Sequence, residues 1–83
     1  MPTPSLLQNL IRTKLAKGRL PLSGIPKMWG GPGNGKTCDV CEQTVTNDEL
    51  LMEGPGGEDS RPVRFHVACL RFWDAERRAF LLP

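Results

Sequence analysis

CDVC at residues 38–41 and HVAC at residues 66–69 together contain all three cysteines and the only histidine of this 83-residue chain. Within each stretch two residues separate the candidate ligands, and 24 residues separate the two stretches. Two thiolates three positions apart on a tight turn can both bind one zinc ion, at about 2.3 Å, and a His and a Cys with the same spacing on the first turn of a helix can supply two more ligands. The spacing therefore predicts one structural Zn²⁺, bound by Cys38, Cys41, His66 and Cys69. The alternative is three reduced cysteines buried as small apolar residues, with a histidine at the surface.

The length of the chain supports a metal site. A core of this size supplies only about 3–5 kcal/mol of stability by itself, and nine Gly and eight Pro limit regular structure further. Three cysteines cannot form a closed set of disulfides. We expect a cytoplasmic protein, since MPTPSLLQNLIRTK lacks the features of a signal peptide and no stretch approaches the ~20 apolar residues of a membrane span.

The order and types of the four ligands resemble a treble-clef zinc finger, and more narrowly the first half of a LIM domain. The resemblance covers residues 38 to about 80 and implies a knuckle, a β-hairpin and a helix that bears the second ligand pair. Two features depart from it: Phe72 stands where a LIM domain would place its next cysteine, and no Gly follows Cys41. The WGGPG segment is also similar to that of small uncharacterised bacterial zinc-binding proteins.

We therefore predict a small α+β domain stabilised by zinc. Its expected parts are an N-terminal amphipathic helix within residues 1–19, a Pro/Gly-rich basic linker at 20–37, and a treble-clef-like zinc domain at 38–83. In the last part, TVTNDELLME and RPVRFH predict short strands, with Val63 and Phe65 on one face. GPGGEDS predicts a turn or loop. HVACLRFWDAERRAF has helical spacing, with Leu70, Trp73 and Phe80 near one stripe and an Asp74–Arg78 pair.

The N-terminal helix has clear local signals. Ser5 and Gln8 predict a capping box with Pro4 just outside the helix, and Gly18 predicts its end. Its apolar stripe either packs against the rest of the chain or docks on a protein partner or a second copy in a homodimer; the stripe consists of Leu6, Leu7, Leu10, Ile11 and Leu15.

GGPGNGKT at residues 30–37 satisfies the phosphate-binding pattern G-x-x-x-x-G-K-[ST]. That function needs a buried strand before the loop and a helix after it. Pro21 and Pro26 exclude a central strand upstream, and a helix starting at Lys36 would carry the first two ligands in its opening turns. We expect no nucleotide binding and interpret the segment as a glycine-rich linker.

Charge divides the chain unevenly. Residues 1–37 contain six Lys or Arg and no acid, whereas residues 38–83 contain nine acids and five Arg. The basic part either folds back on these acids or faces an anionic partner. We expect it to bind nucleic acid with little base specificity, through Arg12, Lys14, Lys17, Arg19, Lys27, Trp29 and Lys36. For Trp29, packing onto the domain is the competing role.

A site closed by four protein ligands predicts a structural metal and no enzyme activity. His66 is followed by Val67 and Ala68 and so lacks the H-x-E of zinc deaminases. The acidic pairs Asp48–Glu49 and Glu58–Asp59 are interpreted as solvated loop charges. Two functions stay open: nucleic-acid binding, which salt weakens steeply, and protein–protein interaction or an adaptor role, which tolerates salt and needs an exposed apolar patch.

Overall fold

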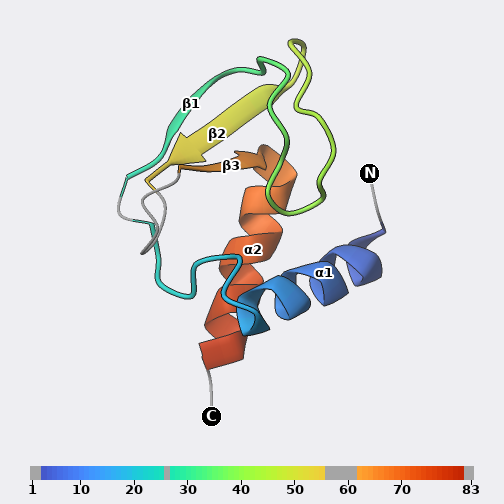
Figure 1. Ribbon diagram of the computed structural model, residues 1–83, viewed down its shortest axis with the longest axis vertical. Coiled ribbons are helices and arrows are strands. Elements are labelled where there is room, and N and C mark those ends of the chain that lie inside the picture. Colours follow the sequence, from blue (N-terminus) through green and yellow to red (C-terminus); the bar gives the residue numbers. More distant parts are fainter. Residues whose placement is uncertain (1–2, 26, 56–61, 82–83) are drawn as a thin grey trace.

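The computed structural model describes residues 3–25, 27–55 and 62–81. In chain order these residues form α1 (Pro4–Ala16), β1 (Trp29–Pro32), β2 (Leu50–Gly54), β3 (Val63–His66) and α2 (Val67–Leu81). The strands make one antiparallel sheet in the order β1-β2-β3. Figure 1 shows α2 running down from the end of β3 and α1 crossing beside it. The predicted α+β class and both predicted helices are confirmed.

Strand β1 lies within residues 20–37, which we predicted to be a Pro/Gly-rich linker. Trp29 to Pro32 pair with Glu53 to Leu50, at the edge of the sheet. Just beyond the ladder the Gly33 N–H donates to the Glu49 carbonyl at 2.8 Å, so alternate residues turn their nitrogens toward β2 and Pro32 turns its nitrogen away. A proline at an outward position of an edge strand removes no ladder hydrogen bond. The strand is short and rich in Gly and Pro, which explains why its sequence pattern did not predict it.

Helix α1 begins two residues earlier than the predicted capping box. Thr3 is the N-cap, and its Oγ1 accepts a hydrogen bond from the Leu6 N–H at 3.3 Å, while Pro4 occupies the first turn. Proline is favoured there because its fixed φ suits the helix and its missing N–H is not needed. The helix ends at Ala16 with Lys17 as C-cap, and Gly18 follows as predicted.

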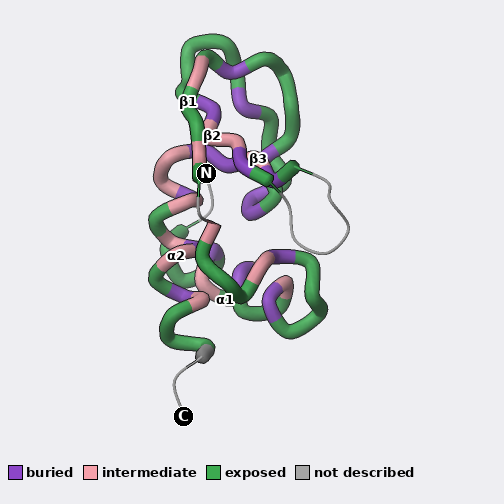
Figure 2. The backbone as a smooth tube through the Cα atoms, turned by 90° about the vertical axis from the view of Figure 1, so that its left-hand side faces the viewer, coloured by how far each residue is buried: buried purple, intermediate pink, exposed green. Residues whose placement is uncertain are grey.

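The apolar stripe of α1 packs within the chain. Leu7, Ile11 and Leu15 are almost fully buried in the same core as the cysteines, whereas Leu6 is 55% exposed. Figure 2 shows α1 lying beside α2, with buried stretches in both helices. The stripe therefore serves the fold, with Leu6 left at its margin.

Trp73 packs in the core and contacts the linker, the role that we considered for Trp29. Its ring stacks on Phe65, with the centroids 5.3 Å apart, and its Nε1 donates to the Pro21 carbonyl at 2.9 Å. Trp29 lies on the edge strand and is 54% exposed. Thus α2 fixes the linker, and Trp29 does not anchor it.

Other details of the second half agree in part with the prediction. Val63 and Phe65 are both buried on one face of β3, and Arg78 lies 3.2 Å from Asp74, as expected. Phe80 is 43% exposed, so it lies outside the buried stripe. The predicted GPGGEDS turn, from residue 56 on, and the pair Glu58–Asp59 lie outside the described residues. Neither helix in the described part is long and apolar enough to cross a membrane.

Candidate metal centre

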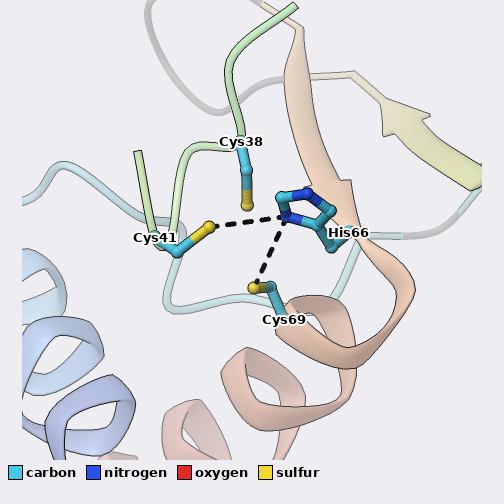
Figure 3. A group of neighbouring side chains, drawn as sticks. All are labelled: Cys38, Cys41, His66 and Cys69. Carbon is cyan, nitrogen blue, oxygen red and sulfur yellow. Dashed lines mark hydrogen bonds between the residues drawn. The ribbon is translucent and has the colours of Figure 1, made fainter. Parts of the chain in front are cut away.

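The four predicted ligands meet at one buried point. The candidate ligand atoms of Cys38, Cys41, His66 and Cys69 all lie within 4.8 Å of one another, and each residue is at most 8% exposed. His66 Nδ1 lies 3.4 Å from Cys41 Sγ and 3.9 Å from Cys69 Sγ, on the side of the ring that faces the thiols (Figure 3). His66 is the last residue of β3 and not part of the helix; Cys69 belongs to the first turn of α2. The arrangement can hold one metal ion.

The first ligand pair lies on the turn of a small hairpin. Thr37 and Thr44 form a bridge below it, and Cys38 exchanges backbone hydrogen bonds with residues across the turn: its N–H donates to Gln43 at 2.9 Å, and its carbonyl accepts from Glu42 at 3.0 Å. The Val40 N–H points at Cys38 Sγ, 3.4 Å away. Such N–H groups stabilise negative charge on sulfur.

Asp39 joins this turn to β3. Its N–H donates to the Arg64 carbonyl at 2.8 Å, and its Oδ2 accepts from the Arg64 N–H at 2.7 Å. Arg64 is two residues before His66. The clamp therefore sets the distance between the two halves of the ligand set.

Glu42 adopts the conformation for which a glycine is usually found. Its φ is +64°, and it is the only non-glycine residue with positive φ among the described ones. A side chain in this left-handed region costs about 1–2 kcal/mol. The turn after Cys41 thus has the shape of a glycine-containing knuckle, with a strained Glu in its place.

The glycines of GGPGNGKT serve the sheet and the turn. A Cβ on Gly33 would overlap the Thr46 carbonyl, and Gly35 has a φ of +82°. Residues 33–49 contain no helix, so the helix N-terminus that a phosphate cradle requires does not follow Lys36. The fold therefore accounts for glycine at positions 33 and 35 without a bound nucleotide.

Only one of the three cysteine side chains favours the ionised form in the metal-free cluster. A hydrogen bond from Cys69, together with backbone N–H groups, lowers the pKa of Cys38 to about 4 from its ordinary 9.0. The same hydrogen bond raises the pKa of Cys69, and burial raises the pKa of Cys41. One thiolate among two thiols is the arrangement expected without a cation. A divalent ion would allow all three to ionise by offsetting their mutual repulsion.

Glu49 is a neighbour of the site that sequence reasoning missed. Its Oε1 lies 3.5 Å from His66 Nε2, the ring nitrogen that faces away from the thiols. The same oxygen accepts hydrogen bonds from the Thr46 N–H and Oγ1, both at 3.0 Å. Glu49 is therefore held in place and does not act as a freely solvated loop charge. The sequence contains a pattern that could have indicated this contact: T-x-x-E at residues 46–49 matches a capping box. Here the pattern lies on a turn that no helix follows.

The predicted basic residues separate into two groups. Lys14 donates to the carbonyls of Asp39 and Val40 at 2.8 and 3.0 Å, and its side chain is only 11% exposed. Arg12 pairs with the buried Glu76 of α2 at 3.0 Å. Both cations contact the chain itself: Lys14 is largely buried, whereas the side chain of Arg12 is 59% exposed although it is paired. The remaining residues are exposed: Lys17, Arg19, Lys27, Trp29 and Lys36.

Neither a protein-family model, nor a curated protein, nor a solved structure matches this chain.

Proposed function

We propose that this protein is a small non-enzymatic binding module built around one structural zinc ion. The observation that carries the proposal is the convergence of three thiols and one imidazole from a turn, a strand and a helix at one buried point. Such a site joins a turn, a strand and a helix that also meet in one apolar core.

The donor set favours zinc. Thiolates with one imidazole, in a tetrahedral arrangement, are typical of structural Zn²⁺ sites, whereas Mg²⁺ and Ca²⁺ prefer oxygen ligands. Four protein ligands complete the coordination of zinc and leave no position for water or substrate. The role assigned to the metal is therefore stabilisation of the fold.

Metal content tests the zinc proposal. Elemental analysis of the purified protein is expected to give one zinc per chain, and Cys69→Ser is expected to lose it because the hydroxyl is a poor zinc ligand. Ala68→Ser places the same hydroxyl one position away and is expected to retain the metal. A folded wild-type protein without bound zinc would contradict the proposal.

For the binding role we propose single-stranded nucleic acid as the partner, bound near β1. Trp29 is 54% exposed, and Lys27 Nζ lies 5.9 Å from the centroid of its ring. An exposed aromatic ring beside a cation can stack on a base while the cation meets a phosphate. Lys17, Arg19 and Lys36 are further exposed cations of this half. Arg12 and Lys14 are left out because they are paired within the chain.

Fluorescence anisotropy with a labelled single-stranded DNA or RNA measures this role. Binding is expected at about 50 mM salt and is expected to weaken steeply by about 200 mM. Trp29→Ala should weaken it by about 1–3 kcal/mol, and Lys17→Ala with Arg19→Ala should lower the salt slope by about two units. Leu22→Ala, at another exposed apolar residue of the same half, is the control. No binding at about 50 mM salt would contradict the role and leave protein–protein interaction as the working hypothesis.

A further inference from the structure

The two nitrogens of the His66 ring face different groups. Nδ1 faces the thiols of Cys41 and Cys69, and Nε2 lies 3.5 Å from the Glu49 carboxylate on the other side. Only one nitrogen of a neutral imidazole carries a proton, so the group beside one nitrogen decides whether the other is free to bind metal.

The Glu49 carboxylate is held beside Nε2, where it can favour the tautomer that carries its proton on this nitrogen. Its Oε1 accepts two hydrogen bonds from Thr46, and its own N–H donates to the Thr46 carbonyl at 3.0 Å, which closes the turn. The side chain of Glu49 is 45% exposed and that of His66 is 11% exposed. The acceptor is therefore fixed by its own turn, although water reaches one side of it.

We propose that Glu49 is a positioning residue of the metal centre: it accepts the Nε2–H of His66 and so keeps Nδ1 unprotonated and aimed at the metal. The inference rests on the proposed zinc site. A carboxylate on the second nitrogen of a metal-bound histidine orients the ring and raises its basicity, and its loss usually reduces metal affinity by about 10–100-fold. The 3.5 Å separation between Nε2 and Oε1 exceeds the usual N–H···O distance of about 2.9 Å but lies within the 4 Å of an ion-pair contact.

Three variants separate the effect of the Glu49–His66 contact on zinc affinity from the effect of negative charge in the turn. Glu49→Ala removes the acceptor and is expected to weaken Zn²⁺ binding by about 10–100-fold. Glu49→Gln keeps an oxygen for both Thr46 and His66 but loses the charge, so a smaller loss of about three- to tenfold is expected. Asp48→Asn removes one charge from the same turn without a contact to His66, and a change within about twofold is expected. Affinity is measured by competition with a chelator, after circular dichroism has shown that each zinc-loaded variant is folded.

Nitrogen-15 NMR supplies a readout that a merely structural role would not move. His66 is the only histidine, so its two ring nitrogens are assigned without ambiguity. In the zinc-loaded wild type the metal is expected on Nδ1 and a slowly exchanging proton on Nε2. Glu49→Ala is expected to speed exchange of that proton with water.

The outcomes distinguish this inference from the proposal beneath it. Zinc bound through Nε2, or equal affinities of Glu49→Ala and Asp48→Asn, would overturn the role of Glu49 and leave the zinc site standing. A wild-type protein that does not bind Zn²⁺ would overturn both.

Discussion

The metal centre and helix α1 are held together by opposite kinds of chemistry. Around the metal centre, one imidazole and three thiols are buried, and their polar atoms face one another. Along α1, three aliphatic side chains are buried, and polar contacts lie at the margins. Burying polar groups is unfavourable without strong partners, whereas burying an aliphatic side chain is favourable by about 1.5–3 kcal/mol. The comparison indicates that the aliphatic contacts of α1 stabilise the fold without a ligand, whereas the buried polar cluster would need a bound ion to do so.

The two regions share one apolar core and are also joined by a polar contact. Lys14 of α1 donates to two carbonyls of the Cys38–Cys41 turn, and it lies 3.4 Å from Glu42 in the same segment. Its positive charge stands beside a centre whose three thiolates would outweigh the charge of one Zn²⁺. A substitution that destabilises either region should therefore also reduce the stability of the other.

Removal of the metal should have the largest effect. Structural zinc contributes about 10–16 kcal/mol of apparent binding free energy, more than a core of this size supplies. A strong chelator is expected to unfold the sheet and the Cys38–Cys41 turn, and to leave α1 as a frayed helix because its docking surface is lost. Far-UV circular dichroism and amide dispersion measure this. Spectra unchanged after verified removal of the metal would show that the aliphatic contacts suffice.

A pH series should show how strongly the metal centre depends on ionisation. Cys38 has a pKa lowered to about 4, whereas the pKa values of Cys41 and Cys69 lie above the ordinary 9.0. These shifts belong to the folded cluster, whereas the metal-free chain is expected to be unfolded, with three protonated thiols near pH 7 and a pKa of about 8.5, as in short peptides. Zinc must therefore displace three protons, and its affinity should rise about 1,000-fold per pH unit between about pH 7 and 8. Calorimetry in buffers of different ionisation enthalpy would count the protons, and release of none would contradict this account.

Lys14→Met tests the link between the regions. The variant keeps the aliphatic stem but removes the donor from the carbonyls of Asp39 and Val40, which should cost about 1–3 kcal/mol in unfolding free energy. Lys17→Met, at an exposed position three residues along, should change it by less than about 0.5 kcal/mol. Urea denaturation of the zinc-loaded proteins measures both. Equal values would show that α1 and the metal centre are not coupled through Lys14.

The smallest effect is expected at Glu42. Glu42→Gly relieves a positive φ, and after the greater freedom of glycine in the unfolded chain is subtracted, a gain of about 0.5 kcal/mol remains. Gln43→Gly is the matched control, because its φ is not positive and the same change should lose about 0.5–1 kcal/mol. Thermal denaturation should therefore shift in opposite directions for the two variants. A shared sign would show that the left-handed backbone carries no strain.

The features that could be predicted from the sequence are local ones. The spacing of Cys38, Cys41, His66 and Cys69 predicted that they would meet, because two ligands three residues apart share a turn and four ligands satisfy one ion. Apolar periodicity predicted both helices and β3, since the period of side chains along an element depends only on its own backbone.

Contacts between residues far apart in the chain could not be predicted and are visible only in the folded structure. Lys14 and the carbonyl of Asp39 are 25 residues apart, Trp73 and Pro21 are 52 apart, and Arg12 and Glu76 are 64 apart. No local pattern encodes such pairs. The sequence therefore suggested that the whole basic segment is available to a partner, although Arg12 and Lys14 are paired within the chain. Edge strand β1 and the Glu49–His66 contact were missed for the same reason: each becomes favourable only when another element supplies the partner for its hydrogen bonds.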